Sequence, residues 1–222
     1  MRITALLRKH TASVLFLHGA GDTGPGVAEW VHSLIGSDIA GKSHIKVRYP
    51  TAPYQSYAPF DGELSNVWFN RPSRDYDAAE IASSMSEAYA IVDGLVQRET
   101  DAGIPLNRII IGGFSNGGVL ALHAGYAMNL TVAGIFAHSA FLNRQSAVYE
   151  QLQAAASGDL PELLMQQGDA DEMVPHAWAE QTYDDLQALG VSGTFSTLNN
   201  TAHELTEESM QELQMWIRDR LP

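Results

Sequence analysis

The residues with the clearest chemical potential lie at positions 109–124, where one serine stands between glycines. A β-branched run, IIIGGF in one-letter code, includes Gly113 and is followed by Ser115, Asn116 and Gly117, after which an apolar helical pattern starts at once. The G-x-S-x-G spacing is typical of a strand-turn-helix elbow that exposes a strained serine at its apex. A glycine turn with an incidental serine is the alternative, because this spacing also arises by chance in a glycine-rich chain.

A serine hydroxyl becomes a nucleophile when an imidazole takes its proton and a carboxylate orients that imidazole. In enzymes with such an elbow the chain order is Ser, then Asp or Glu, then His. Here Ser115 is followed by Asp169 and Asp171, in the loop after an expected strand, and then by His203, in the polar loop before the last expected helix. From the residues alone the two aspartates are nearly equal candidates, because only one of them can point into the site.

Seven other histidines compete with His203 for the role of general base. His138 is the serious rival, because it ends the expected strand after the nucleophile helix and can face the same cleft. The triad order places the base last in the chain and therefore favours His203. The remaining histidines precede the serine or lie in expected helices: His10, His18, His32, His44, His123 and His176.

The tetrahedral intermediate of acyl transfer carries an oxyanion that needs two backbone donors. One is expected from Asn116, directly after the serine, and the other from an earlier loop between a strand and a helix. The glycine-rich segment 18–24 supplies that loop, with Ala20 as the expected second donor. This segment lacks both the lysine of a Walker loop and the full dinucleotide-binding spacing, and we find no metal-spaced cluster. We therefore expect no cofactor and no metal.

Strands and helices are expected to alternate along the chain and to place these residues in loops. Besides the strand before Ser115, apolar or β-branched runs predict strands at 13–18, 44–49, 67–69, 131–137, 163–167 and 194–197. Apolar faces at helical spacing predict helices at 27–35, 77–96, 176–189 and 204–220, and a long loop is expected at 50–66. Such alternation indicates a mostly parallel sheet whose site lies at the carboxyl ends of the strands.

Length and composition indicate a single α/β domain of 222 residues, in which residues 1–12 are expected to be irregular. The formal charge of −13 disfavours nucleic acid and anionic membrane surfaces as partners. Because the chain has no cysteine, disulfides, a cysteine nucleophile and S-palmitoylation are excluded. The apolar stretch before Arg8 and Lys9 is too short for a secretory signal, and no run reaches membrane-spanning length. These features together predict a cytoplasmic protein.

Seven segments of the chain match the motifs of a known family: FLHG at 16–19, YPTAP at 49–53, SNVWF at 65–69, NRIIIGGFS at 107–115, FLN at 141–143, SAVY at 146–149 and HEL at 203–205. Together they resemble the acyl-protein thioesterase and lysophospholipase family of α/β hydrolases. The resemblance covers nearly all of residues 13–222, and it implies an α/β-hydrolase fold with a mostly parallel central sheet and helices on both faces. It also implies activity on carboxylic esters or thioesters without a cofactor.

The same resemblance implies roles for individual residues. It implies a catalytic triad of Ser115, Asp171 and His203, which chooses Asp171 over Asp169. It further implies that Trp68 lies beside the active site, where it would contact substrate. None of these roles requires a metal ion or a bound cofactor.

The sequence departs from the family pattern at three positions. Asn116 stands where the family often has Gln or Met, Asn70 where Asp is usual, and His138 where an apolar residue is common. None of these departures removes a triad member. Acyl-protein thioesterases also carry an amino-terminal cysteine that is itself acylated. Because this chain has no cysteine, we expect no stable membrane anchor.

We expect a serine hydrolase that forms an acyl-enzyme from an ester or a thioester. Residues 54–66 carry many polar side chains, which favours a shallow pocket capped against Trp68 and a preference for short acyl chains. Depalmitoylation of proteins and hydrolysis of lysophospholipids are the alternatives within this class, so the substrate is a small ester or an acylated protein or lipid. A catalytically silent binding scaffold is the alternative of another class. The sequence does not fix the oligomeric state.

Overall fold

The computed structural model describes residues 10–154 and 159–222. Its first strand, β1, spans Ala12–Leu17, and Ala12 already pairs with Ile45 of the neighbouring strand. The expectation that residues 1–12 are irregular is therefore wrong at Ala12. For residues 1–9 that expectation lies outside the described part of the chain.

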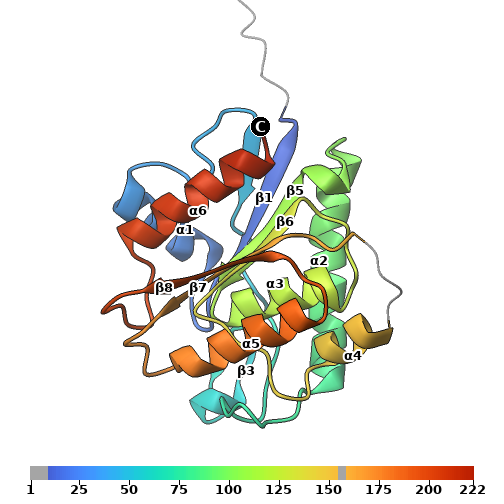
Figure 1. Ribbon diagram of the computed structural model, residues 1–222, viewed down its shortest axis with the longest axis vertical. Helices are drawn as coiled ribbons and strands as arrows, with labels where there is room; N and C mark the ends of the chain where they lie inside the picture. The colour runs from blue at the N-terminus through green and yellow to red at the C-terminus, as the bar shows by residue number, and fades with distance from the viewer. Residues whose placement is uncertain (1–9, 155–158) are drawn as a thin grey trace, which may run out of the picture.

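In the part of the chain that the structure describes, six parallel strands form the central sheet, in the order β2-β1-β5-β6-β7-β8 (Figure 1). The strands β1, β5, β6 and β7 are buried along their whole length, as expected for apolar runs in a sheet covered on both faces. Besides β1, their bounds are Ile45–Arg48 for β2, Ile109–Phe114 for β5, Gly134–His138 for β6, Leu163–Gly168 for β7 and Gly193–Leu198 for β8.

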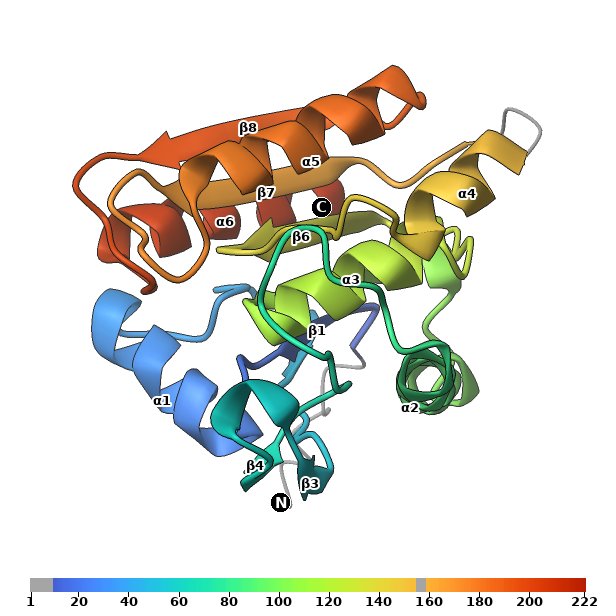
Figure 2. The same cartoon turned by 90° about the horizontal axis from the view of Figure 1, so that it is seen from below.

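Helices cover both faces of this sheet and confirm the predicted layers (Figure 2). Helices α1 (Gly24–Ile35) and α6 (Glu207–Arg220) pack side by side on one face, over one buried apolar cluster. A second apolar cluster fills the other face, beneath the remaining four helices. These are α2 (Ala82–Asp101), α3 (Asn116–Tyr126), α4 (Ala147–Ala154) and α5 (His176–Ala188).

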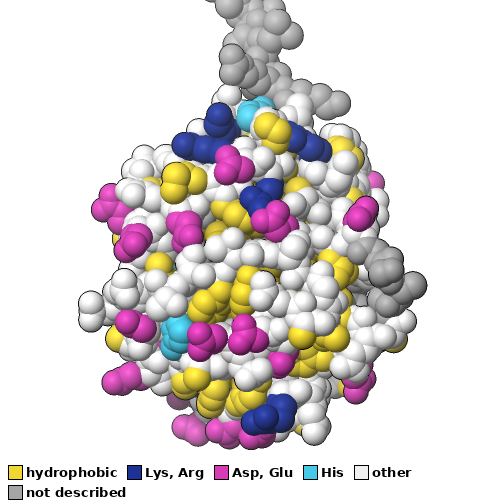
Figure 3. Space-filling view, in the orientation of Figure 1, with side chains coloured by type: hydrophobic (Ala, Val, Ile, Leu, Met, Phe, Trp, Pro, Cys, Tyr) yellow, Lys and Arg dark blue, Asp and Glu magenta, His cyan; other side chains and the backbone are white. Residues whose placement is uncertain are grey.

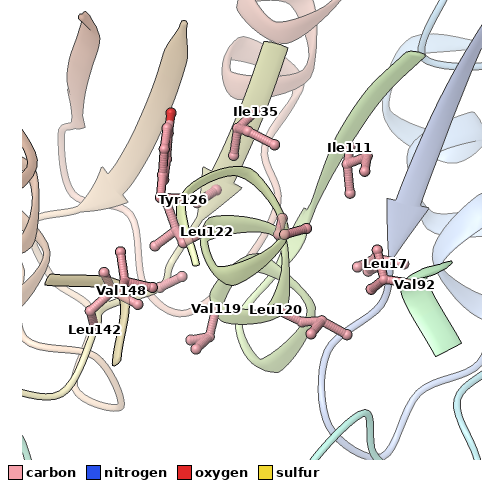
Figure 4. Close-up of a cluster of buried hydrophobic side chains, with 14 of the residues drawn as sticks. Leu17, Val92, Ile111, Val119, Leu120, Leu122, Tyr126, Ile135, Leu142 and Val148 are labelled. Carbon is pink, nitrogen blue, oxygen red and sulfur yellow. The ribbon is translucent and has the colours of Figure 1, made fainter. Parts of the chain in front are cut away.

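Helix α3, which follows the serine elbow, is buried along its whole length. Figure 4 shows its side chains among those of the flanking elements, with Ile111 of β5 and Val92 of α2 on one side and Val148 of α4 on the other. The first turn of α3 is therefore held by the core of the molecule. A side chain at this position has little freedom to shift relative to the sheet.

Two expectations about residues 50–69 are wrong in detail. The expected long loop contains a small antiparallel sheet of β3 (Tyr54–Ser56) and β4 (Leu64–Asn66), joined through a 3₁₀ turn at Ala58–Phe60. Residues 67–69, expected as a strand, form an irregular segment. Their apolar side chains are buried by tertiary contacts, and the N–H of Trp68 donates to the side chain of Asn116.

The helices that differ most from the predicted pattern are α2 and α4. Helix α2 begins at Ala82 and not at residue 77, and Glu80 precedes it. The Oε1 of Glu80 lies 3.1 Å from Nε2 of His123, and its Oε2 accepts the N–H of Ala147. That N–H opens the short helix α4, for which the sequence analysis has no corresponding element.

In the two described ranges, no helix combines the length and the apolar character that crossing a membrane requires.

Candidate active site

The turn between β5 and α3 places Ser115 immediately before the helix. Ser115 has φ 52° and ψ −117°, a conformation that residues other than glycine seldom adopt, and its N–H donates to the carbonyl of His138 at 2.8 Å. A Cβ atom on either Gly113 or Gly117 would collide with the carbonyl oxygen of Leu17. Glycine at both positions therefore permits the close approach of β1, β5 and α3 that the motif predicts.

An imidazole and a carboxylate meet in the loops that follow the last two strands. Nδ1 of His203 lies 2.7 Å from Oδ2 of Asp171. The other oxygen of this carboxylate accepts the N–H groups of Met173 and Val174, each at 2.8 Å. Burial would raise the pKa of Asp171, but the hydrogen bonds from His203 and these backbone groups hold that pKa below its ordinary value. Asp171 is therefore an anion that fixes the orientation of the His203 ring.

The structure separates the two aspartates that the sequence left open. Asp169 is exposed, and its carboxylate accepts no hydrogen bond from any described residue. Asp171 is buried and contacts His203 directly. Of the two, Asp171 is the one whose geometry suits the carboxylate of a triad.

One cavity of about 450 Å³ has both Ser115 and His203 in its lining. Its wall also includes Phe114, whose ring centroid lies 4.8 Å from that of His203. Among the described residues Oγ of Ser115 has no hydrogen-bond partner, and catalytic hydrogen bonds of this kind often tighten only around bound substrate. The hydroxyl and the imidazole thus share one compartment in which a proton could pass between them.

Two backbone donors face the same compartment. Ala20 and Asn116 both line the cavity. Within residues 10–154 and 159–222, neither of their N–H groups donates to an acceptor. Asn116 is also the first residue of α3, where the helix dipole favours negative charge. The pair therefore has the free donors that an oxyanion hole requires.

Trp68 is buried, with only 1% of its surface exposed, and it is not among the residues that line the cavity. Its Nε1–H donates to the carbonyl of His18 at 2.8 Å, and its backbone N–H donates to Oδ1 of Asn116 at 2.9 Å. The expected direct contact of Trp68 with substrate is thus not what the geometry offers. The indole supports the loop that carries Ala20, while the Asn116 amide clamps the irregular segment 67–69.

His138, the rival base, is fully buried and does not line the cavity. Its Nδ1 lies 3.0 Å from Oγ of Ser139, and its Nε2 is buried without a partner among the described residues. Burial, together with the nearby His203, lowers the pKa of His138 to about 3. The ring is therefore neutral and enclosed, and it has no path to the hydroxyl of Ser115 through the cavity.

Several cavity residues are absent from the set predicted as site residues. Tyr57 and Phe60, from the segment 54–66, form an edge-to-face pair with centroids 4.9 Å apart, and both line the cavity. Arg71, Arg74 and Phe141 also line it. No local pattern signals the two arginines, because the strand expected at 67–69 suggests no turn toward the site.

Asn70 is one of the three departures from the family pattern. It links residues 54–66, which we call the cap, to helix α2. Its Oδ1 accepts the N–H groups of Ala58 and Arg71, each at 2.9 Å. Its own N–H donates to Oγ of Ser84 in α2 at 2.8 Å. The side-chain amide therefore fixes the 3₁₀ turn of the cap above the cavity.

Across the described ranges, no group of three or more His, Cys, Asp or Glu side chains is placed to hold a metal ion. The chemistry available in the cavity is then that of a serine hydroxyl, an imidazole held by a carboxylate, and two free backbone donors. These are the parts that acyl transfer to water uses.

Comparisons with known proteins identify the family. The family model for Phospholipase/Carboxylesterase matches residues 1–221. Lysophospholipase-like protein 1 of Mus musculus is 44% identical over 214 residues, which cover 96% of this chain and 89% of the relative. Acyl-protein thioesterase 1 homolog 1 of Dictyostelium discoideum is 30% identical over 96% of this chain and 92% of the relative.

The structural comparison supports the fold. A variant of SOBER1 from Arabidopsis thaliana superposes with a TM-score of 0.83 at 23% identity, covering 95% of this chain and all of that one. At that identity the likeness establishes the α/β-hydrolase architecture alone, while the family match spans nearly the whole chain. The protein therefore belongs to the phospholipase/carboxylesterase family of α/β hydrolases and is an enzyme of the carboxylesterase and thioesterase type.

Proposed function

We propose that the protein hydrolyses carboxylic esters or thioesters through a covalent acyl-enzyme on Ser115, with His203 as general base and acid and Asp171 as its orienting carboxylate. The main observation behind this proposal is the 2.7 Å distance between Nδ1 of His203 and Oδ2 of Asp171. The imidazole of His203 lines the same cavity as Ser115. The order Ser, Asp, His along the chain matches the order that the serine elbow requires.

In the first half-reaction Oγ of Ser115 attacks the acyl carbon while Nε2 of His203 takes the hydroxyl proton. The oxyanion that forms is stabilised by the N–H groups of Ala20 and Asn116. Collapse breaks the bond from the acyl carbon to oxygen or sulfur, and His203 returns its proton to the departing alcohol or thiol. Asp171 remains ionised throughout and stabilises the imidazolium.

In the second half-reaction water replaces the alcohol. The water oxygen attacks the acyl carbon while His203 takes one proton from the water. The N–H groups of Ala20 and Asn116 again stabilise the oxyanion. Collapse breaks the ester bond to Ser115, which recovers the proton from His203, and the carboxylic acid leaves. The cycle consumes one ester and one water and needs no redox partner.

A fluorophosphonate probe separates this function from that of a silent binding scaffold. The native protein should be labelled, and heating or Ser115→Ala should abolish the label, because only an activated serine reacts. Ser83→Ala, at an exposed position of α2 outside the cavity lining, is a matched control that should label like the parent protein. Labelling that survives Ser115→Ala would reject the assignment.

For the acyl chain we propose a preference for short groups. A palmitoyl chain would bury many methylenes, each worth about 0.8 kcal/mol, against apolar walls. The cavity lining mixes aromatic side chains with three charged ones, Asp22, Arg71 and Arg74. We therefore expect kcat/KM for p-nitrophenyl esters, measured below micelle formation, to fall from butyrate towards palmitate. A steady rise with chain length would instead favour long-chain substrates.

The second candidate is the removal of acyl groups from proteins. It is favoured by the 30% identity to a protein named acyl-protein thioesterase 1 homolog 1. Lysophospholipid hydrolysis is the corresponding lipid reaction within the family. We place either activity in the cytoplasm without a stable membrane anchor, since the chain has no cysteine to acylate. Turnover of a palmitoylated peptide faster than that of p-nitrophenyl butyrate would support protein deacylation.

A further inference from the structure

Two arginine side chains line the cavity that holds Ser115. Arg71 is buried and Arg74 is half-buried. Neither guanidinium forms an ion pair with a carboxylate in the described parts of the chain. The arginines that do so lie elsewhere: Arg48, Arg144 and Arg220.

The surroundings of Arg71 leave its positive charge without an anion. Its Nη2 donates to Oδ1 of Asn143 at 3.3 Å, and its guanidinium carbon lies 5.0 Å and 5.6 Å from the ring centroids of Phe141 and Phe69. Its Nε is buried without a hydrogen-bond partner among the described residues. Burial lowers the pKa of Arg71, and the neighbouring charge of Arg74 adds to the effect.

The nearby carboxylates are engaged by other groups. Glu80 exerts an attraction on Arg71, but its oxygens contact Nε2 of His123 and the N–H of Ala147. Asp22 lines the same cavity, and its Oδ1 accepts the N–H of Thr23. A buried cation of this kind is costly unless a further anion joins it.

We propose that the cavity takes esters or thioesters that carry a carboxylate, which the guanidinium of Arg71 binds while Arg74 attracts it at the rim. This proposal rests on the proposed function and names its substrate class. The planar guanidinium matches a carboxylate, which would give the buried cation its missing partner. The carboxylate is bound and not consumed, so the hydrolytic steps are unchanged.

The charge of the rest of the protein makes these arginines more informative. The formal net charge is −13, and Figure 3 shows acidic side chains spread over one face, with Lys and Arg gathered mainly near the end that carries the C-terminus. Such a protein repels anions in general. The two arginines in the cavity lining therefore make the local charge positive at the place where substrate must bind.

The test compares esters that differ by one carboxylate. On the acyl side, mono-p-nitrophenyl adipate is compared with p-nitrophenyl hexanoate, in which a methyl replaces the carboxylate. On the alcohol side, the hexanoyl ester of 4-hydroxybenzoate is compared with that of its methyl ester. The measured quantity is the ratio of kcat/KM within each pair, for the parent protein, Arg71→Met, Arg71→Lys and Arg98→Met.

In the parent protein we expect the carboxylate ester of at least one pair to be hydrolysed at least as efficiently as its neutral partner. Arg71→Met should lower that ratio by about tenfold or more, mainly through KM, as expected for one lost charged hydrogen bond. Arg71→Lys should retain part of the preference. Arg98→Met, which removes an exposed charge on α2, should leave the ratio unchanged.

A neutral ester preferred by more than tenfold in both pairs of the parent protein would overturn the proposal, even if the Arg71 variants do not fold. So would an unchanged ratio in a folded Arg71→Met variant. Failure of the underlying function looks different: Ser115→Ala would then still hydrolyse both neutral esters. The two ideas can therefore be rejected separately.

Discussion

Two groups of Ser, His and carboxylate side chains lie on opposite ends of helix α3. The cavity cluster is Ser115, His203 and Asp171, and the buried cluster is Ser146, His123 and Glu80. In the buried cluster Nε2 of His123 lies 3.1 Å from Glu80 and 3.5 Å from Ser146, and its Nδ1 lies 2.8 Å from the hydroxyl of Tyr89. His123 is 0% exposed. These contacts join α3 to the segments around α2 and α4.

The two clusters share residue types but not surroundings. In the cavity cluster the serine hydroxyl has no hydrogen-bond partner among the described residues, and the serine lies on a strained elbow near two free backbone donors. In the buried cluster the hydroxyl of Ser146 is 1% exposed and accepts the N–H of Val148. Access to the cavity and free donors for an oxyanion therefore distinguish the cluster for which we propose catalysis from the buried one.

The largest expected effect is on turnover of an activated ester by serine variants of the two clusters. Ser115→Ala should lower kcat for p-nitrophenyl butyrate by at least about 10³-fold, because triad members act as a unit. Ser146→Ala, measured on folded protein, should change kcat by less than twofold. Circular dichroism checks that both variants fold. An equal loss in both variants would remove the distinction between the clusters.

The next effect concerns the dependence of activity on pH. We expect kcat/KM to rise with pH through the neutral range, because His203 must be unprotonated to accept the proton of Ser115. His138 is neutral here, since its pKa is lowered to about 3, so His138→Gln should keep the same profile. A flat profile between about pH 5 and 8 would speak against a histidine base. If the His138→Gln variant loses this rise with pH, the general base would be His138 and not His203.

The smallest expected effect is on the stability of the fold at acidic pH, where the carboxylates of Asp171 and Glu80 should behave alike. The folded-state pKa of Asp171 and that of Glu80 are held low, although burial opposes this, by hydrogen bonds that include the partner histidine. A depressed pKa stabilises the fold above the ordinary carboxyl pKa near 4, and that contribution disappears as pH falls through the folded value.

Asp171→Asn and Glu80→Gln test this point by urea unfolding from pH 7 to pH 3. Each should lower the free energy of unfolding at pH 7 by about 1–3 kcal/mol, the cost of breaking a buried hydrogen bond to a charged group. For both variants the difference from the parent protein should shrink below about pH 4. A difference that stays constant with pH would show that the carboxylate charge is not the cause.

The alternation of strands and helices and the serine elbow could be predicted because local signals carry them. The buried strand β5 has a β-branched run, and the glycines on either side of Ser115 report a backbone contact that leaves no room for Cβ atoms. The loops after β7 and β8 followed from the same alternation, which placed Asp171 and His203 at one edge of the sheet. The triad order already favoured His203 over His138, whereas the choice of Asp171 over Asp169 needed either the family resemblance or the coordinates.

The cap and the buried cluster could not be predicted because long-range contacts determine them. Trp68 reads as part of a strand, yet its partners are His18 and Asn116, which lie 50 and 48 positions away. The helical pattern includes Glu80, but this residue precedes the start of α2 and contacts His123, 43 positions later. No periodicity within a short window reports contacts of this kind.

The most direct test of the central claim is to locate the acyl group during turnover. The protein is mixed with p-nitrophenyl butyrate, quenched in acid within the first turnovers, digested and analysed by mass spectrometry. A butyryl group on the peptide that contains Ser115, and its absence from the peptide that contains Ser146, is the predicted result. Hydrolysis without any serine adduct in the quenched protein, or an adduct on another residue, would contradict the account.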